Sequence, residues 1–180
     1  MHVWLVGLAA LLAEPAPSAA SELPLSLQIP AFLKALDFER GLTINESSLV
    51  IGVVFDPNDR ASVESKDRVL AIQAQLTRLR VRGKRVALEE FAYTPGRPIL
   101  VADVLLLTAL DASGVEALSR HAQSAGIVTL ATDPTDVERG MVLGVESLEG
   151  KPRFVVNLTA AKASGVSFEA RFLNLCRIVE

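Results

Sequence analysis

The strongest constraint on the fold is a regular alternation between short apolar segments and longer amphipathic ones. Leu49–Phe55 (LVIGVVF) is the clearest apolar segment, because it is continuous and rich in β-branched residues. A strand that is apolar on both faces is typical of the middle of a parallel sheet. Segments at Lys84–Phe91, Val104–Thr108 and Ile127–Ala131 predict three further strands. The alternation therefore predicts an α/β fold.

Amphipathic segments precede and separate these strands. Apolar residues at helical spacing predict a short helix over Ile29–Leu36, with Pro30 tolerated in its first turn. The same spacing predicts helices over Ser62–Arg80 and Ala112–Ala125. The first strand, the helix after it and the next strand form a βαβ unit, which should cross over in the right-handed sense.

The last third of the chain predicts a hairpin followed by helix. Met141–Leu148 and Arg153–Leu158 flank a turn-forming sequence, which is typical of an antiparallel hairpin. A turn of helix is expected at Thr159–Ala163. A closing helix is expected over Phe168–Val179, with a wide apolar face for docking. The predicted architecture is a three-layer α/β sandwich whose mostly parallel sheet ends in this hairpin and closing helix.

The N-terminal segment predicts an export signal. Val3–Ala13 is apolar over a signal-peptide length and is too short to anchor in a bilayer. Prolines follow, and the small residues Ser18 and Ala20 fit a signal-peptidase site. We expect residues 1–20 to be a signal peptide, with 21–180 a single domain exported to the periplasm. A ragged apolar N-terminus is the alternative, since the start of the chain lacks Lys and Arg.

Residues with catalytic chemistry are sparse. Cys176, the only cysteine, falls on the apolar side of the predicted last helix, so a buried structural thiol is expected. His121, the only histidine after the signal, is expected on a solvated helix surface. The sequence contains no glycine-rich phosphate loop and no clustered metal ligands. We therefore expect no enzymatic activity, no cofactor and no metal.

Charge and composition argue against a nucleic-acid partner. The formal net charge is −3, and aromatic residues make up only 5% of the chain, too few for base stacking. The densest basic stretch, Arg78–Arg85, falls where a helix is expected to end. Cations are favoured there by the helix macrodipole, so a solvated helix end explains them.

Polar residues follow the predicted strands at the edge where open α/β sheets bind ligands. Under this rule six residues would line any crevice: Asp56, Asn58, Thr108, Asp111, Thr132 and Asp133. Asp56 and Asp59 also suggest Mg²⁺ binding of the kind seen in receiver domains. Turn and N-cap roles are the simpler explanation of these two carboxylates.

The last third also contains a distinctive order of residues. A Gly-Met pair precedes the strand RFVVNL, which is followed by an Ala-Ala pair, a glycine and a Leu-rich segment. This order resembles the closing signature of the YfiR/HmsC family of periplasmic proteins. The matching positions are Gly140, Met141, Phe154, Asn157, Leu158, Ala160, Ala161 and Gly165. Members usually carry an aromatic-Pro pair where this chain has Asp37-Phe38-Glu39-Arg40.

The resemblance implies a periplasmic regulatory protein that docks to a membrane-bound signalling partner and restrains it, typically a diguanylate cyclase. The same ending resembles the terminal segment of substrate-binding proteins of ATP-driven transporters, of which this chain would supply one lobe. That alternative implies a small-molecule-binding module. A partner surface needs exposed apolar area, whereas a solute binder needs a deep pocket. We expect no transmembrane segment in the mature chain and leave a homodimer open.

Overall fold

The computed structural model describes residues 23–44, 48–76, 80–97 and 101–180, so the expected signal peptide lies outside the described residues. The strands are β1 (Ser48–Phe55), β2 (Arg80–Val81), β3 (Lys84–Ala92), β4 (Val104–Ala109), β5 (Val128–Ala131), β6 (Leu143–Leu148), β7 (Lys151–Asn157) and β8 (Cys176–Val179). The helices are α1 (Leu25–Leu36), α2 (Arg60–Ala71), α3 (Gln73–Leu76), α4 (Ala112–Ala125), α5 (Thr135–Glu138), α6 (Leu158–Ala163) and α7 (Ala170–Leu173).

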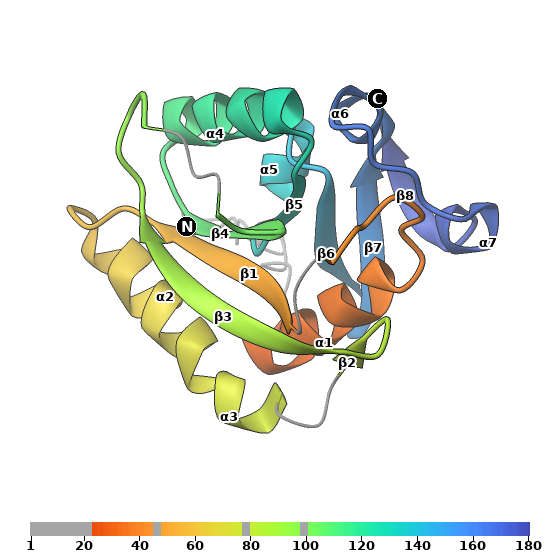
Figure 1. The fold of residues 1–180 in the computed structure, drawn as a ribbon, viewed down its shortest axis with the longest axis horizontal. Coiled ribbons are helices and arrows are strands. Elements are labelled where there is room, and N and C mark those ends of the chain that lie inside the picture. Colours follow the sequence, from red (N-terminus) through yellow and green to blue (C-terminus); the bar gives the residue numbers. More distant parts are fainter. Residues whose placement is uncertain (1–22, 45–47, 77–79, 98–100) are drawn as a thin grey trace, which may run out of the picture.

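The strands form one eight-stranded sheet in the order β2-β3-β1-β4-β5-β6-β7-β8, with helices on both faces (Figure 1). In this order, each neighbouring pair along β3-β1-β4-β5-β6 is parallel. The pairs β2–β3 and β6–β7 are antiparallel. This confirms the predicted α/β fold with a mostly parallel sheet and an added hairpin. The hairpin turn is Glu149-Gly150, with φ of 52° and 76°, the backbone of a two-residue type I′ turn.

The side chains of β4 show how the sheet separates two apolar layers. Val104 and Leu106 pack into the cluster that contains the apolar residues of α1 and α2. Leu105 and Leu107 pack into the cluster on the opposite face, beneath α4. Alternate residues of a strand point to opposite faces, so a continuously apolar strand lies buried on both sides.

Helix α4 has the predicted bounds, because both of its ends are specified locally. The Asp111 carboxylate accepts a hydrogen bond from the Gly114 N–H at 2.7 Å and caps the first turn. Gly126 ends the helix in the left-handed conformation, with φ of 70°.

The first two predicted helices differ from the structure at their boundaries. Helix α1 begins at Leu25, so Pro30 lies inside it and not in its first turn. The helix predicted over Ser62–Arg80 stops at Ala71 and continues only as the short α3, and Arg80 belongs to β2. Arg82 and Gly83 both have positive φ and form the tight turn between β2 and β3. The described part of the basic stretch, residues 80–85, therefore forms a hairpin, which local helical spacing does not predict.

The predicted closing helix over Phe168–Val179 is wrong. Only Ala170–Leu173 is helical, and Cys176–Val179 forms β8, which pairs in parallel with β7. Without β8, the backbone groups along the outer edge of β7 would be unpaired. The β-branched Ile178 and Val179 fit a strand, so long-range pairing outweighs the helical periodicity. The expected turn of helix at Thr159–Ala163 is present as α6.

An aromatic cluster joins the two ends of the described chain. The ring of Phe38, just after α1, stacks on the ring of Phe172 in α7, with centroids 5.4 Å apart. Phe154 and Phe168 also pack against Phe172, at 5.0 and 5.2 Å. Within the described ranges, no helix combines the length and apolar character that crossing a membrane requires.

Candidate functional site

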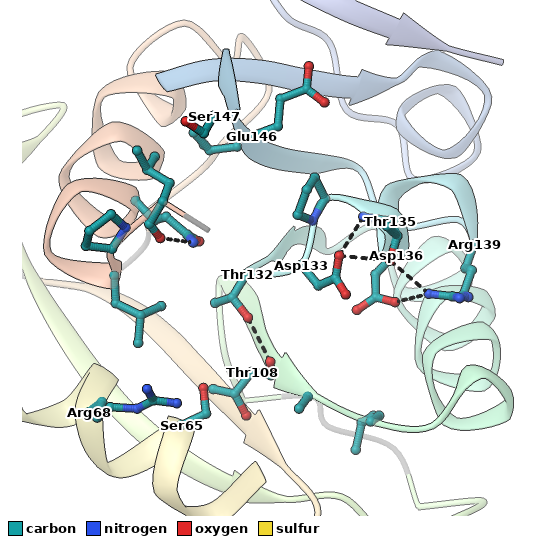
Figure 2. A pocket seen from close by; sticks show the side chains of 18 of the residues that line it. Ser65, Arg68, Thr108, Thr132, Asp133, Thr135, Asp136, Arg139, Glu146 and Ser147 are labelled. Atoms are coloured by element: carbon teal, nitrogen blue, oxygen red, sulfur yellow. Dashed lines mark hydrogen bonds and ion pairs between the residues drawn. The ribbon is translucent and has the colours of Figure 1, made fainter. Parts of the chain in front are cut away.

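A cleft of about 700 Å³ lies outside the carboxyl ends of β4 and β5 (Figure 2). Its walls come from the start of α1, the middle of α2, the segment from the end of β4 to the start of α4, the segment from the end of β5 through α5, and β6. The chain runs from β1 to β3 on one side and then to β4 on the other side of β1. Such a reversal of strand order creates a crevice, which is where ligands bind in open α/β sheets.

Hydroxyl groups hold the strand ends beside the cleft in fixed positions. Thr132 Oγ1 donates to the Thr108 carbonyl oxygen at 2.7 Å, and Thr108 Oγ1 donates to the Val54 carbonyl oxygen at 3.0 Å. Ser62 Oγ, near the start of α2, donates to the Ala109 carbonyl oxygen at 2.7 Å. These bonds tie the ends of β1, β4 and β5 to one another and to α2, so this part of the cleft is pre-formed.

One wall carries two carboxylates close together. Asp133 Oδ1 accepts hydrogen bonds from the Thr135 N–H and hydroxyl, both at 2.8 Å. Asp136 is buried, and its Oδ1 accepts from Arg139 Nη1 at 2.8 Å. Burial is the main cause that raises the pKa of Asp136 above its ordinary value; the Arg139 hydrogen bond lowers it, and the charge of Asp133 raises it further. Asp133 itself has no cationic partner among the described residues.

The facing helices supply polar groups of a different kind. Arg68 and the buried Ser65 line the cleft from α2, and Figure 2 shows them on the same wall. The Arg68 side chain is exposed, and among the described residues it makes no ion pair or hydrogen bond. Gln28, 5% exposed on α1, donates through Nε2 to the Leu23 carbonyl oxygen at 2.7 Å. Its buried Oε1 accepts no hydrogen bond from any residue that the structure describes.

The remaining acidic group of the cleft is compensated. Glu146 on β6 accepts from Arg177 Nε at 3.1 Å and also pairs with Arg153. Because two guanidinium groups already contact this carboxylate, it adds little free negative charge to the cleft.

The structure brings together three of the six residues that strand-end reasoning selects. Thr108, Thr132 and Asp133 line the cleft, whereas the other three do not. Asp56 accepts from the Asn58 N–H in a turn at 2.8 Å, and Asp111 caps α4. In the described part of the chain, no group of three or more His, Cys, Asp or Glu side chains is placed to hold a metal ion.

The residues that sequence reasoning missed lie on helices. Ser65 and Arg68 are one turn apart on α2, and Gln28 precedes the apolar positions of α1. The signal for Ser65 and Gln28 is a polar residue within the buried stripe of an amphipathic helix, since Ser65 shares that stripe with Val69 and Gln28 shares its own with Ile29. Arg68 is exposed, and its residue type alone does not mark it.

The C-terminal signature residues surround a different part of the fold. Asn157 Oδ1 accepts from the Ala160 N–H at 2.8 Å and caps α6, while its Nδ2 donates to the Val137 carbonyl oxygen at 2.9 Å. Gly140 has φ of 105°, and a Cβ there would come within 2.4 Å of Ser119 Oγ. These positions hold the hairpin, α5 and α6 together and do not line the cleft. The other signature residues are Met141, Phe154, Leu158, Ala161 and Gly165.

Strand β8 forms one edge of the sheet and carries exposed apolar side chains. Leu175, just before it, is 71% exposed, and Ile178 is 39% exposed. Cys176 is half-buried, and its Sγ donates to the Phe172 carbonyl oxygen at 3.2 Å. Burial raises the pKa of Cys176 to about 11, so its thiolate is scarce at neutral pH.

The sequence matches a known protein family. A family profile described as YfiR/HmsC-like matches residues 53–177. No curated protein matches the sequence.

Three solved structures share the fold. A conserved domain protein from Vibrio cholerae is 17% identical, with a TM-score of 0.58 over 87% of this chain and 60% of its own. A ligand-free, open substrate-binding protein with adhesive properties from Clostridium difficile is 17% identical, with a TM-score of 0.53 over 74% of this chain and 55% of its own. An ABC domain in complex with L-Trp from Streptococcus pneumoniae is 14% identical, with a TM-score of 0.56 over 87% of this chain and 60% of its own.

Proposed function

Because this chain belongs to the YfiR/HmsC-like family, we propose that it is an exported, non-catalytic regulator that binds a membrane-bound signalling partner and restrains it. The family match over residues 53–177 carries this proposal, since it supports a periplasmic regulatory role. In this proposal the partner is typically a diguanylate cyclase, and the contact is made to its periplasmic sensor region.

The surface that we assign to this contact is the β8 edge, defined as Leu175 together with β8. Leu175 and Ile178 offer apolar area to a partner. An edge strand also presents backbone donors and acceptors on its outer side, and a partner strand can pair with them. Exposed apolar side chains beside an open strand edge fit a protein partner better than they fit a small solute.

A pull-down from solubilised membranes tests the proposal. The mature protein, carrying an affinity tag, is incubated with detergent-solubilised membranes of its own host, and the retained proteins are identified by mass spectrometry. We expect a membrane protein with a periplasmic sensor region and a cyclase domain. Recovery of transporter subunits alone would contradict the regulatory role.

The cleft favours a second candidate function, a small-molecule-binding module related to one lobe of a transporter substrate-binding protein. Its volume of about 700 Å³ falls in the usual range for small-molecule sites, roughly 300–1,000 Å³. One fold neighbour is a substrate-binding protein and another is in complex with L-Trp. The chain spans 55–60% of the length of these neighbours, so it would supply one lobe. Recovery of a permease in the same pull-down would favour this candidate.

A further inference from the structure

We infer that this protein forms a symmetric dimer, in which the start of β1 and β3 packs against the same surface of a second copy. The surface lies on the side of the sheet that carries α4, and we call it the open face, defined as Val50, Arg85, Ala87 and Glu89. The inference does not depend on the β8 edge, because β3 and β8 lie toward opposite edges of the sheet.

The open face lacks the helical cover that the rest of the sheet has. On the other side of the sheet, Leu49 of β1 and Leu88 of β3 are buried in the cluster that contains α1 and α2. Their neighbours Val50 and Ala87 point to the α4 side and pair with each other in the sheet, yet both are only half-buried. Helix α4 lies over β4 and β5 (Figure 1), so its cover does not extend to the start of β1 and β3.

Two opposite charges flank Ala87 on this face. Side chains two residues apart on a strand share a face, so Arg85, Ala87 and Glu89 point the same way. Phe91 is next in this row, and it packs against the apolar cluster on the α4 side. Arg85 and Glu89 are exposed, and neither makes an ion pair with any described residue. They lie about 13 Å apart along the strand, too far to pair within one chain.

This arrangement of charges is complementary to itself. In a two-fold symmetric contact, residue i of one copy meets residue j of the other, and j meets i. An axis that passes between the two Ala87 residues, with the β3 strands antiparallel, brings Arg85 of each copy opposite Glu89 of the other. Two ion pairs then form together, from charges that a single copy leaves unpaired.

The apolar residues fit the same contact. Packed sheets lie about 10 Å apart, and the short side chain of Ala87 at the axis allows this approach while Arg85 and Glu89 reach across. Val50 lies beside Ala87 and adds apolar area that the contact removes from water. A second copy supplies both charges at the required spacing, so it is the occupant that we assign to the open face.

Such a dimer leaves the β8 edge of both copies free. Where the β8 edge binds a membrane partner, as proposed above, one dimer offers that contact twice, which strengthens binding to a partner that is itself paired. This consequence rests on the proposed function, whereas the dimer itself does not.

Light scattering after size-exclusion chromatography of the purified protein, over a concentration series, tests the inference. Wild type should reach twice the mass of one chain. Arg85→Glu and Glu89→Arg each place like charges opposite one another at both ends of the contact, so each should self-associate about 10- to 100-fold more weakly. A wild-type protein that stays monomeric throughout the series would overturn the inference.

Exchange of the two charges identifies the contact. The double variant, Arg85→Glu with Glu89→Arg, restores opposite charges across the axis and should dimerise as wild type does. An equimolar mixture of the two single variants should also dimerise, because each supplies the charge that the other lacks. A variant that merely fails to fold would not recover on mixing, so failure of either rescue would overturn the inference.

Lys151→Glu is the matched control, because Lys151 is exposed on β7, away from the open face, and the change of charge is the same. It should leave the mass unchanged. The pull-down from membranes tests the other occupant. Arg85→Glu should still capture the membrane partner through the β8 edge. Loss of capture by this variant, with a monomeric wild type, would assign the open face to that partner and overturn the dimer.

Discussion

The buried carboxylate of Glu39 accepts a hydrogen bond from the backbone N–H of Ser167, 128 residues further along the chain, at 3.0 Å. The same carboxylate, in a residue 1% exposed, accepts from the N–H groups of Gly41 and Leu42, and Arg82 lies 3.9 Å away. Glu39 therefore fastens the segment after α1 to the C-terminal part of the fold. It occupies the stretch where the chain departs from the aromatic-Pro pattern of its family.

Replacing Glu39 with Gln should lower the free energy of unfolding by about 2 kcal/mol, because hydrogen bonds to a charged acceptor contribute roughly 1.5–3 kcal/mol. Urea denaturation followed by circular dichroism measures the change. Glu64→Gln is the control, since Glu64 is exposed and its one ion pair among the described residues is with Arg60; it should cost less than about 0.5 kcal/mol. Equal stabilities for the two variants would show that Glu39 has no such role.

Gly140→Ala should destabilise the protein by about 2–4 kcal/mol, because it combines a positive φ with a steric clash against Ser119. Gly83→Ala separates the two causes. Its φ is +77°, but nothing lies within 4 Å of the added Cβ, so only backbone strain of about 1 kcal/mol is expected. Thermal unfolding of both variants gives the comparison. A smaller loss for Gly140→Ala than for Gly83→Ala would contradict the packing argument.

The stability of wild type relative to Asp136→Asn should depend on pH. Burial raises the pKa of Asp136 above its ordinary value near 3.8, so the folded protein binds this proton more tightly than the unfolded chain does. Ionised Asp136 therefore costs stability above the raised pKa, and this cost is removed as the pH falls through the raised pKa toward 3.8.

The measurement is the urea midpoint of both proteins from neutral to acidic pH. Because the two chains share all other carboxylates, only the difference between their curves reports on Asp136. As the pH falls, the urea midpoint of wild type should rise relative to that of Asp136→Asn. A fall of the wild-type midpoint relative to the variant would show that the Arg139 hydrogen bond affects the stability of ionised Asp136 more than burial does.

Leu175→Asp should abolish capture of the membrane partner without unfolding the protein, because Leu175 is 71% exposed and a charge there cannot be buried in an apolar contact. Leu27→Asp is the matched control: Leu27 is 51% exposed on α1, away from the β8 edge. Quantitative pull-down compares the three proteins. Unchanged capture by Leu175→Asp would place the contact elsewhere.

The central part of the fold can be predicted from sequence because it is specified locally. The strands near Leu49 and Val104 are apolar on both faces, and α4 carries a capping Asp111 and a closing Gly126. The C-terminal strand cannot be predicted in this way. Cys176–Val179 forms β8 because it pairs with β7, and the sequence of the segment alone does not show that β7 lies beside it.

The residues of the cleft likewise divide into those that local sequence predicts and those that depend on tertiary packing. Thr108, Thr132 and Asp133 follow strands, so the rule that ligands bind beyond the carboxyl ends of strands finds them. Arg68 and Gln28 belong to helices whose positions depend on tertiary packing. Their place in the cleft follows only once α1 and α2 are set against the sheet.

The stack of Phe38 on Phe172 has a consequence for the order in which the protein matures. A polypeptide that emerges from its N-terminal end exposes Phe38 well before Phe172, so this ring stack forms only after residue 172 has emerged. The apolar residues of α1 itself find earlier partners, because they pack in the same cluster as residues of β1, α2 and β4. Loss of Phe172 would therefore leave the Phe38 ring without its stacking partner while the rest of the α1 contacts remain.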